Sequence, residues 1–208
     1  IQVVPNFIES SLYKHENNSG LRRSFVRDDE KLIIHISNFR KVKRVQDVLK
    51  VFSKIQDKVA SKLILIGDGP ERLEMEQLSR NLDLCDNVRF IGKLKAVERI
   101  LSVSDLFLLP SATESFGLVA LEAMASHVPV ISTNTGGLPE VNIEGKTGFL
   151  LDVKDIKSMA EKSIELLSDE DKLIQFKECA YKHAMQFDLP NILPMYEAIY
   201  EDLSSKAQ

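Results

Sequence analysis

The sequence lacks several features that mark whole classes of protein. It has no tryptophan and two cysteines, Cys85 and Cys179, whose separation fits neither a redox motif nor a metal site. It has no run of 18 apolar residues and no charged-then-apolar leader, so we expect no membrane span. Lys and Arg number 27 against 31 Asp and Glu, a net charge of -4 that argues against nucleic-acid binding. These absences predict a reduced, cytoplasmic protein.

Complete nucleotide-binding glycine motifs are also missing. Gly67-Asp68-Gly69 follows an apolar run, but Arg72 stands where the dinucleotide fingerprint needs its third glycine. Gly145-Lys146-Thr147 resembles the end of a phosphate-binding loop, but Glu140 replaces that motif's first glycine. A nucleotide-dependent oxidoreductase is therefore an unfavoured alternative. The four histidines share no spacing, so we interpret them as surface or core residues.

The sequence does contain a regular alternation of apolar runs and helix-period stretches. Continuous apolar runs occur at 32–36, 63–66, 88–91, 106–109 and 128–132, and helix-period segments separate them. Runs of this kind are what a parallel sheet requires when helices cover both of its faces. We predict an α/β fold with a Rossmann-like, doubly wound parallel sheet. Its ligands should gather at the carboxyl ends of the strands.

The pattern changes after residue 151. Three amphipathic helices are predicted there, at 154–168, 171–187 and 192–203, and no linker or repeat is evident. We therefore expect residues 1–208 to form a single domain in which 152–208 is a helical tail. The chain opens at Ile1 without an initiator Met, and its first residues look like the end of a strand that belongs to something longer.

The segment 110–140 carries the densest chemistry. A strand ends near Leu109, a polar loop follows, and a helix begins at about Phe116-Gly117. The free amides and the positive dipole end of a helix N-terminus suit a diphosphate. Gly117 lets a ligand approach the backbone closely, and Gly136-Gly137 offers a second such place.

Two glutamates in this segment need partners. Glu114 lies in the loop just before the helix, and Glu122 lies on its second turn among apolar residues. A carboxylate in such a setting is costly unless something donates to it, and ribose hydroxyls are suitable donors. The alternative is purely structural, with Glu114 as a helix cap and Glu122 in a salt bridge.

These residues resemble a known family. Glu114 and Glu122 form a Glu-x7-Glu motif in the context Pro-Ser-x-x-Glu-Ser-Phe-Gly, followed by Thr-Gly-Gly-Leu-Pro-Glu and Gly-Lys-Thr-Gly-Phe-Leu. The set resembles the retaining nucleotide-sugar glycosyltransferases of family 4 (group 1) with the GT-B fold. Such enzymes have two Rossmann-like domains facing a cleft, and the likeness is to the carboxyl-terminal, donor-binding half. The resemblance implies that the acceptor is bound mainly by an N-terminal domain absent from this chain, without which the domain is inactive.

The resemblance also implies roles for particular residues. Glu122 would bind the ribose hydroxyls, and Glu114 would hold the donor sugar near its anomeric carbon. Ser115 and the amides of Phe116, Gly117 and Leu118 would meet the diphosphate, with Gly136 and Gly137 nearby.

Cations would neutralise the leaving phosphate in this scheme. Lys43 matches the family lysine for that role, but Asn38 stands at the position of the family arginine. Either Arg40 supplies the missing cation, or binding rests more on Lys43 and Arg44. Lys43 and Arg44 lie at the start of a predicted helix, where cations oppose the helix dipole, so an anionic ligand should compensate them. The alternative is that the two form a solvated helix start.

Residues 37–45 resemble a narrower branch, bacterial enzymes of bacillithiol synthesis that transfer N-acetylglucosamine from UDP to L-malate. The resemblance implies a retaining transfer from a UDP-sugar, with no cofactor and no metal. A non-catalytic nucleotide-sugar binding module is the alternative from another class. The sequence leaves the oligomeric state open, a homo-oligomer included.

Overall fold

A parallel sheet forms the centre of the protein in the computed structural model, which describes residues 3–13 and 18–206. Its six strands lie in the order β3-β2-β1-β4-β5-β6, and all the pairings are parallel. The strands are β1 (Lys31–Ile36), β2 (Ser61–Ile66), β3 (Val88–Gly92), β4 (Leu106–Leu109), β5 (Val130–Thr133) and β6 (Gly148–Leu151). The doubly wound Rossmann-like fold is confirmed.

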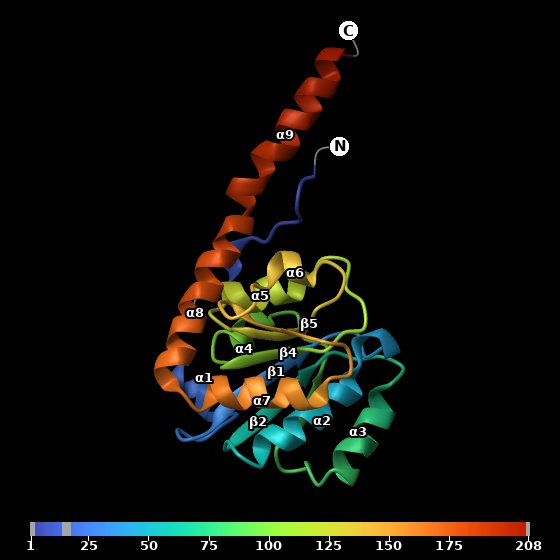
Figure 1. Ribbon diagram of the computed structural model, residues 1–208, viewed down its shortest axis with the longest axis vertical. Helices are drawn as coiled ribbons and strands as arrows, with labels where there is room; N and C mark the ends of the chain where they lie inside the picture. Colours follow the sequence, from blue (N-terminus) through green and yellow to red (C-terminus); the bar gives the residue numbers. More distant parts are fainter. Residues whose placement is uncertain (1–2, 14–17, 207–208) are drawn as a thin grey trace.

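Helices connect the strands and cover both faces of the sheet (Figure 1). The α-helices are α1 (Ser19–Arg23), α2 (Val45–Gln56), α3 (Arg72–Asn81), α4 (Glu98–Leu101), α5 (Leu118–Ala125), α6 (Leu138–Val141), α7 (Ile156–Leu167), α8 (Glu170–Ala184) and α9 (Leu189–Lys206). Short 3-10 turns lie at η1 (Ser10–Leu12), η2 (Lys41–Lys43) and η3 (Met185–Phe187).

Two apolar cores lie on opposite faces of the sheet, because successive strand residues point to opposite sides. In β1, Leu32 and Ile34 belong to the core beneath α4 and α5, whereas Ile33 belongs to the core beneath α2, α3 and α7. In β4, Phe107 joins the first core and Leu108 the second. This double burial explains why the strands read as unbroken apolar runs.

The chain reverses its direction of winding between β1 and β4. From β1 it proceeds through β2 to β3 on one side, and β4 then returns to the other side of β1. The loops after β1 and β4 therefore meet at the topological switch point of the sheet, at the carboxyl ends of its strands. In a doubly wound sheet this is where the crevice that binds ligands forms.

The predicted helical tail divides into two parts. Met159 of α7 and Phe176 of α8 belong to one core, and Ala180 of α8 belongs to the other, so these helices are part of the packed body. Helix α9 instead projects from the body, with the N-terminal segment beside its first half (Figure 1). No helix among the described residues is long and apolar enough to cross a membrane.

Several predicted bounds shift. The strand expected at 128–132 begins at Val130, and the helix expected at 171–187 ends at Ala184, where the 3-10 turn η3 follows. Residues 3–7 form no strand, contrary to the prediction for the start of the chain, and Ile1 and Gln2 lie outside the described residues. Ile8 instead makes an isolated bridge to Asp188 at the start of α9.

Candidate functional site

An ion pair joins the loop after β1 to the loop after β4. Lys43 Nζ in η2 lies 2.5 Å from Glu114 Oε1 in the loop after β4, and the same oxygen accepts from Ser111 Oγ at 2.9 Å. Glu114 is 9% exposed. The backbone reinforces the contact, because the amide of Ala112 donates to the carbonyl of Val42 at 2.8 Å. The fold thus brings together two predicted site residues that are 71 positions apart.

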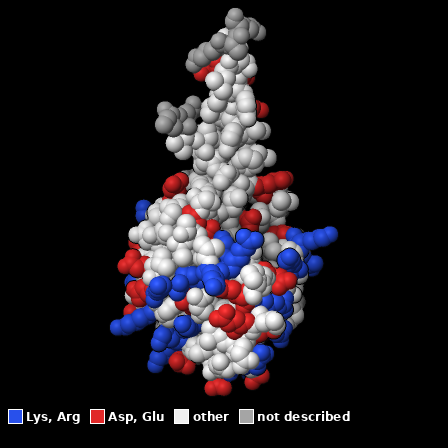
Figure 2. Space-filling model, turned by 90° about the vertical axis from the view of Figure 1, so that its right-hand side faces the viewer, with Lys and Arg blue, Asp and Glu red and all other residues white. Residues whose placement is uncertain are grey.

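Two arginines, Arg40 and Arg44, lie close to Lys43 in the sequence. Arg40 and Asn38 are exposed in the loop after β1, and the backbone of Arg44 is left-handed, with a φ of 50°. Arg44 Nε pairs with Asp47 Oδ2. The anionic compensation that we expected for Lys43 and Arg44 is therefore supplied by two protein carboxylates. Figure 2 faces the side on which the loops after β1 and β4 lie and shows Lys and Arg gathered in a band across it.

The start of α5 adjoins the same loop. Gly117 is its N-cap residue, with a φ of 96°, and no side chain caps this end of the helix. Glu114 is therefore not a helix cap, which removes one half of the structural alternative. Ser115 is exposed, Phe116 is buried and Leu118 is 43% exposed, so the first turn of α5 meets solvent on one side.

Gly136 and Gly137 pack against the backbone of the loop after β4. A Cβ on Gly136, whose φ is 57°, would lie 1.8 Å from the carbonyl oxygen of Glu114, and one on Gly137 would lie 2.4 Å from that of Ser115. The amide of Gly137 also donates to the carbonyl of Glu114 at 2.9 Å. The two glycines thus permit close contact between backbones, and their predicted contact with a donor remains a prediction.

Glu122 is half-buried on α5 and has a partner that the sequence did not reveal. Its carboxylate is hydrogen-bonded to the phenol of Tyr13, and Glu98 of α4 is close enough to repel it. Burial, with a contribution from Glu98, raises the pKa of Glu122, although the Tyr13 bond opposes that shift. No salt bridge to Glu122 is found among the described residues. A carboxylate kept in a setting that disfavours its charge is typical of a functional position.

A hollow lies at the amino ends of β1 and β4, away from Lys43 and Glu114. It measures about 630 Å³, and Asp105, Arg22 and Lys177 are among the residues that line it. Asp105 accepts from Arg22 and Lys177 at 2.8 Å each and from the amide of Leu32. Burial would raise the pKa of Asp105, but Lys177, Arg22 and this amide outweigh it and lower the pKa. The charges of this hollow are matched within the protein, as those of Lys43 and Glu114 are, and none of the site residues predicted from the sequence lines it.

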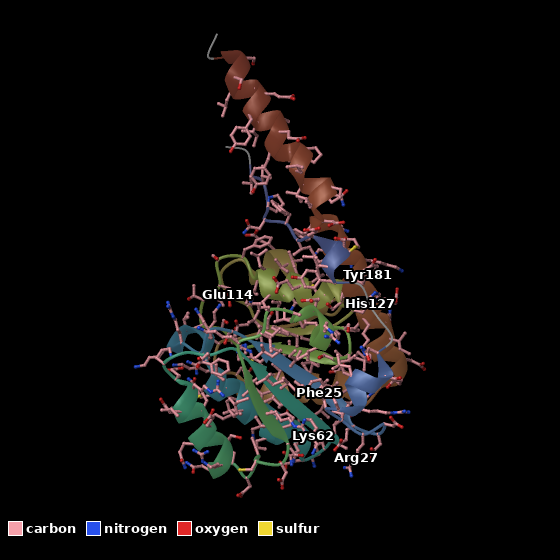
Figure 3. The ribbon with its side chains drawn as sticks, turned by 180° about the vertical axis from the view of Figure 1, so that it is seen from behind. Phe25, Arg27, Lys62, Glu114, His127 and Tyr181 are labelled. Carbon is pink, nitrogen blue, oxygen red and sulfur yellow. The ribbon has the colours of Figure 1, made fainter. Side chains whose placement is uncertain are left out.

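His127 lines the hollow beside Asp105 and stacks on Tyr181, with ring centroids 4.1 Å apart. Figure 3 shows both residues on the opposite side of the fold from Glu114. His127 has a φ of 59° just after α5, a turn position that glycine often fills. We interpret His127 as a structural residue. Among the described residues, no group of three or more His, Cys, Asp or Glu is arranged to hold a metal ion.

Comparison with known families assigns the class of protein that this fold and site define. Residues 20–183 match the family described as glycosyl transferases group 1, and the chain belongs to that family. It is 47% identical over 205 residues to N-acetyl-alpha-D-glucosaminyl L-malate synthase of Bacillus anthracis, an alignment that covers 98% of this chain and 54% of the relative. It is 39% identical over 141 residues to a D-inositol 3-phosphate glycosyltransferase of Corynebacterium urealyticum, covering 66% of this chain and 33% of that protein.

Solved structures agree on the fold. Anabaena HepE in complex with UDP and glucose superposes with a TM-score of 0.88 at 25% identity, over 98% of this chain and 56% of that one. Sucrose-phosphate synthase of Thermosynechococcus elongatus has the same fold, with a TM-score of 0.91 at 24% identity, over 99% of this chain and 53% of that one. The chain thus spans about half the length of these proteins and of the malate synthase.

Proposed function

We propose that this chain is the donor-binding half of a retaining glycosyltransferase that uses a UDP-sugar. The observation that carries the proposal is the pairing of Lys43 with Glu114 beside the uncapped start of α5, at the point where the sheet reverses its winding. A cation and free amides there suit a diphosphate, and a carboxylate suits sugar hydroxyls. The complex of Anabaena HepE with UDP and glucose supports this choice of ligand.

Different residues bind the diphosphate, the sugar and the ribose in this proposal. Lys43, Arg40 and the amides of Phe116, Gly117 and Leu118 balance the charge that develops on the departing diphosphate, so no metal is needed. Glu114 holds the sugar through its second oxygen, since Oε1 is taken by Lys43 and Ser111 and no bond to Oε2 is found among the described residues. Glu122 binds the ribose.

The reaction then follows the family scheme. The acceptor hydroxyl attacks the anomeric carbon from the face that the diphosphate leaves, so one C–O bond forms as another breaks, and the proton passes to the leaving phosphate oxygen. The 47% identity to the malate synthase supports N-acetylglucosamine as the sugar and L-malate as the acceptor. The acceptor is held mainly by a second domain outside this chain.

Calorimetry on the full-length protein tests the donor site. We expect UDP and UDP-N-acetylglucosamine to bind and NAD not to bind. Lys43→Ala should weaken UDP binding by roughly tenfold or more, the loss expected for a charge-assisted contact of 1.5–3 kcal/mol. Lys41→Ala, in the same 3-10 turn but exposed, is the matched control and should leave the affinity unchanged. Binding of NAD in place of UDP would refute the proposal.

Turnover separates an enzyme from a binding module. We expect the full-length protein to transfer N-acetylglucosamine from UDP to L-malate with retention of configuration, as followed by NMR of the product. UDP binding without transfer to any acceptor would favour the non-catalytic module instead.

A further inference from the structure

A buried histidine lies close enough to Lys43 and Glu114 to be influenced by the charges of both. His35, in β1, is completely buried, and both of its ring nitrogens have partners. Nδ1 lies 2.7 Å from the carbonyl oxygen of Leu108 in β4, and Nε2 lies 2.8 Å from Ser37 Oγ in the loop after β1. The ring also stacks between Phe39 of that loop and Phe107 of β4, with centroids 6.5 and 6.3 Å away.

The chemistry of these partners fixes the state of the ring. Burial, helped by the charge of Lys43, lowers the pKa of His35 to about 4, although the Leu108 carbonyl and Glu114 oppose this shift. The imidazole is therefore neutral at neutral pH. A carbonyl can only accept, so Nδ1 carries the proton and Nε2 accepts from the Ser37 hydroxyl.

His35 links β1 to β4 beyond the point where the backbone pairing of these two strands stops. The register between β1 and β4 runs only through Ile33–Leu106 and Ile34–Phe107, whereas β1 pairs with β2 over all six residues. The next residue, His35, joins the two strands through its side chain. It does so at the carboxyl ends of β1 and β4, where the loop bearing Lys43 and the loop bearing Glu114 begin.

Ser37 transmits this connection to the loop. Its amide donates to the carbonyl of Ile66 at 3.0 Å, and its own carbonyl packs against Gly67, where a Cβ would come within 1.8 Å. Its main chain is thus held by β2, while its hydroxyl is held through His35 by β4. Asn38, Arg40 and Lys43 follow within six residues.

We propose that His35 and Ser37 are a positioning pair, which sets the loop 38–44 against the Glu114 loop and so determines affinity for the diphosphate of the donor. Neither residue touches the donor. The inference rests on the proposed function, because it assigns the pair to that same site.

Ser37→Ala is the sharpest test, because it removes one hydroxyl and leaves the stacked ring in place. In the full-length protein we expect the affinity for UDP to fall about tenfold, a change typical of one lost interaction. The affinity for uridine, which has no phosphate, should not change. Ser37→Thr keeps the hydroxyl and should restore UDP binding.

Ser104→Ala is the matched control. Ser104 is buried, whereas Ser37 is partly buried, and the Ser104 hydroxyl donates to the carbonyl of Ile100 at 2.8 Å, just before the amino end of β4. It should lower the melting temperature about as much as Ser37→Ala and leave UDP binding unchanged. The inference is overturned if Ser37→Ala binds UDP like the wild type, if uridine is weakened equally, or if threonine fails to rescue. If the wild type does not bind UDP, the proposed function fails as well.

Discussion

At the scale of single residues, the site holds charged and titratable groups in settings that only a partner makes tolerable. Glu114 is nearly buried but has Lys43 and Ser111, and Glu122 is half-buried with Tyr13 beside it. His35 is buried in its neutral form, with the Leu108 carbonyl as acceptor at one ring nitrogen and the Ser37 hydroxyl as donor at the other. Glu114 is matched by an ion pair, as Asp105 is, whereas Glu122 has no salt bridge among the described residues.

The buried His35 makes stability depend on pH in a defined window. Its pKa is about 4 in the folded protein and near 6.5 in the unfolded chain, so the unfolded state binds more protons between these values. The free energy of unfolding should therefore fall as the pH drops from 6.5 to 4, by up to about 3 kcal/mol for this group. Lys43 and Glu114 are the charged groups that act on it.

Urea unfolding at several pH values measures this effect against His35→Gln, which cannot take up the proton. The difference in unfolding free energy between the two proteins should change with pH inside this window and stay constant above it. Parallel pH curves would show that the histidine contributes nothing.

At the scale of elements, the loops after β1 and β4 are packed closely against neighbouring backbone at glycines, which have no Cβ to prevent the contact. Gly136→Ala places a Cβ against the carbonyl oxygen of Glu114, and the backbone of Gly136 has a left-handed φ. Both the steric clash and the backbone strain therefore destabilise the variant. We expect a loss of at least about 3 kcal/mol in the free energy of unfolding, with weaker UDP binding. Thermal and urea unfolding measure the first effect and calorimetry the second.

Gly145→Ala is its control, because Gly145 also has a left-handed φ, of 70°, but nothing lies within 4 Å of its Cβ position. It should lose only the strain term of about 1–2 kcal/mol and bind UDP normally. Equal losses for the two variants would contradict the close backbone contact that we describe.

The elements themselves were largely predictable from the sequence, and the contacts between them were not. Apolar runs such as 63–66 and 106–109 identify strands because both of their faces are buried. Short α6 and the 3-10 turns lack a full helical period and were missed. The Glu-x7-Glu spacing located Glu114 and Glu122, but no local pattern linked Glu122 to Tyr13 or His35 to Leu108. Those bonds join residues distant in sequence, and only the strand order brings them together.

At the scale of the whole molecule, the proposed site lies at the carboxyl ends of the strands and the hollow beside Asp105 lies at their amino ends. The carboxyl ends carry the loops with Lys43 and Glu114 and the start of α5. The hollow at the amino ends has its charges matched by Arg22 and Lys177. The family to which the chain belongs transfers sugars, and an open donor edge is what a second domain across a cleft would need.

The crystal structure of the full-length protein with UDP tests the location of the donor site most directly. Our account predicts a diphosphate within hydrogen-bond distance of Lys43 Nζ and of the amides of Gly117 and Leu118, with the ribose at Glu122. UDP bound in the hollow beside Asp105, or a diphosphate remote from Lys43, would contradict it.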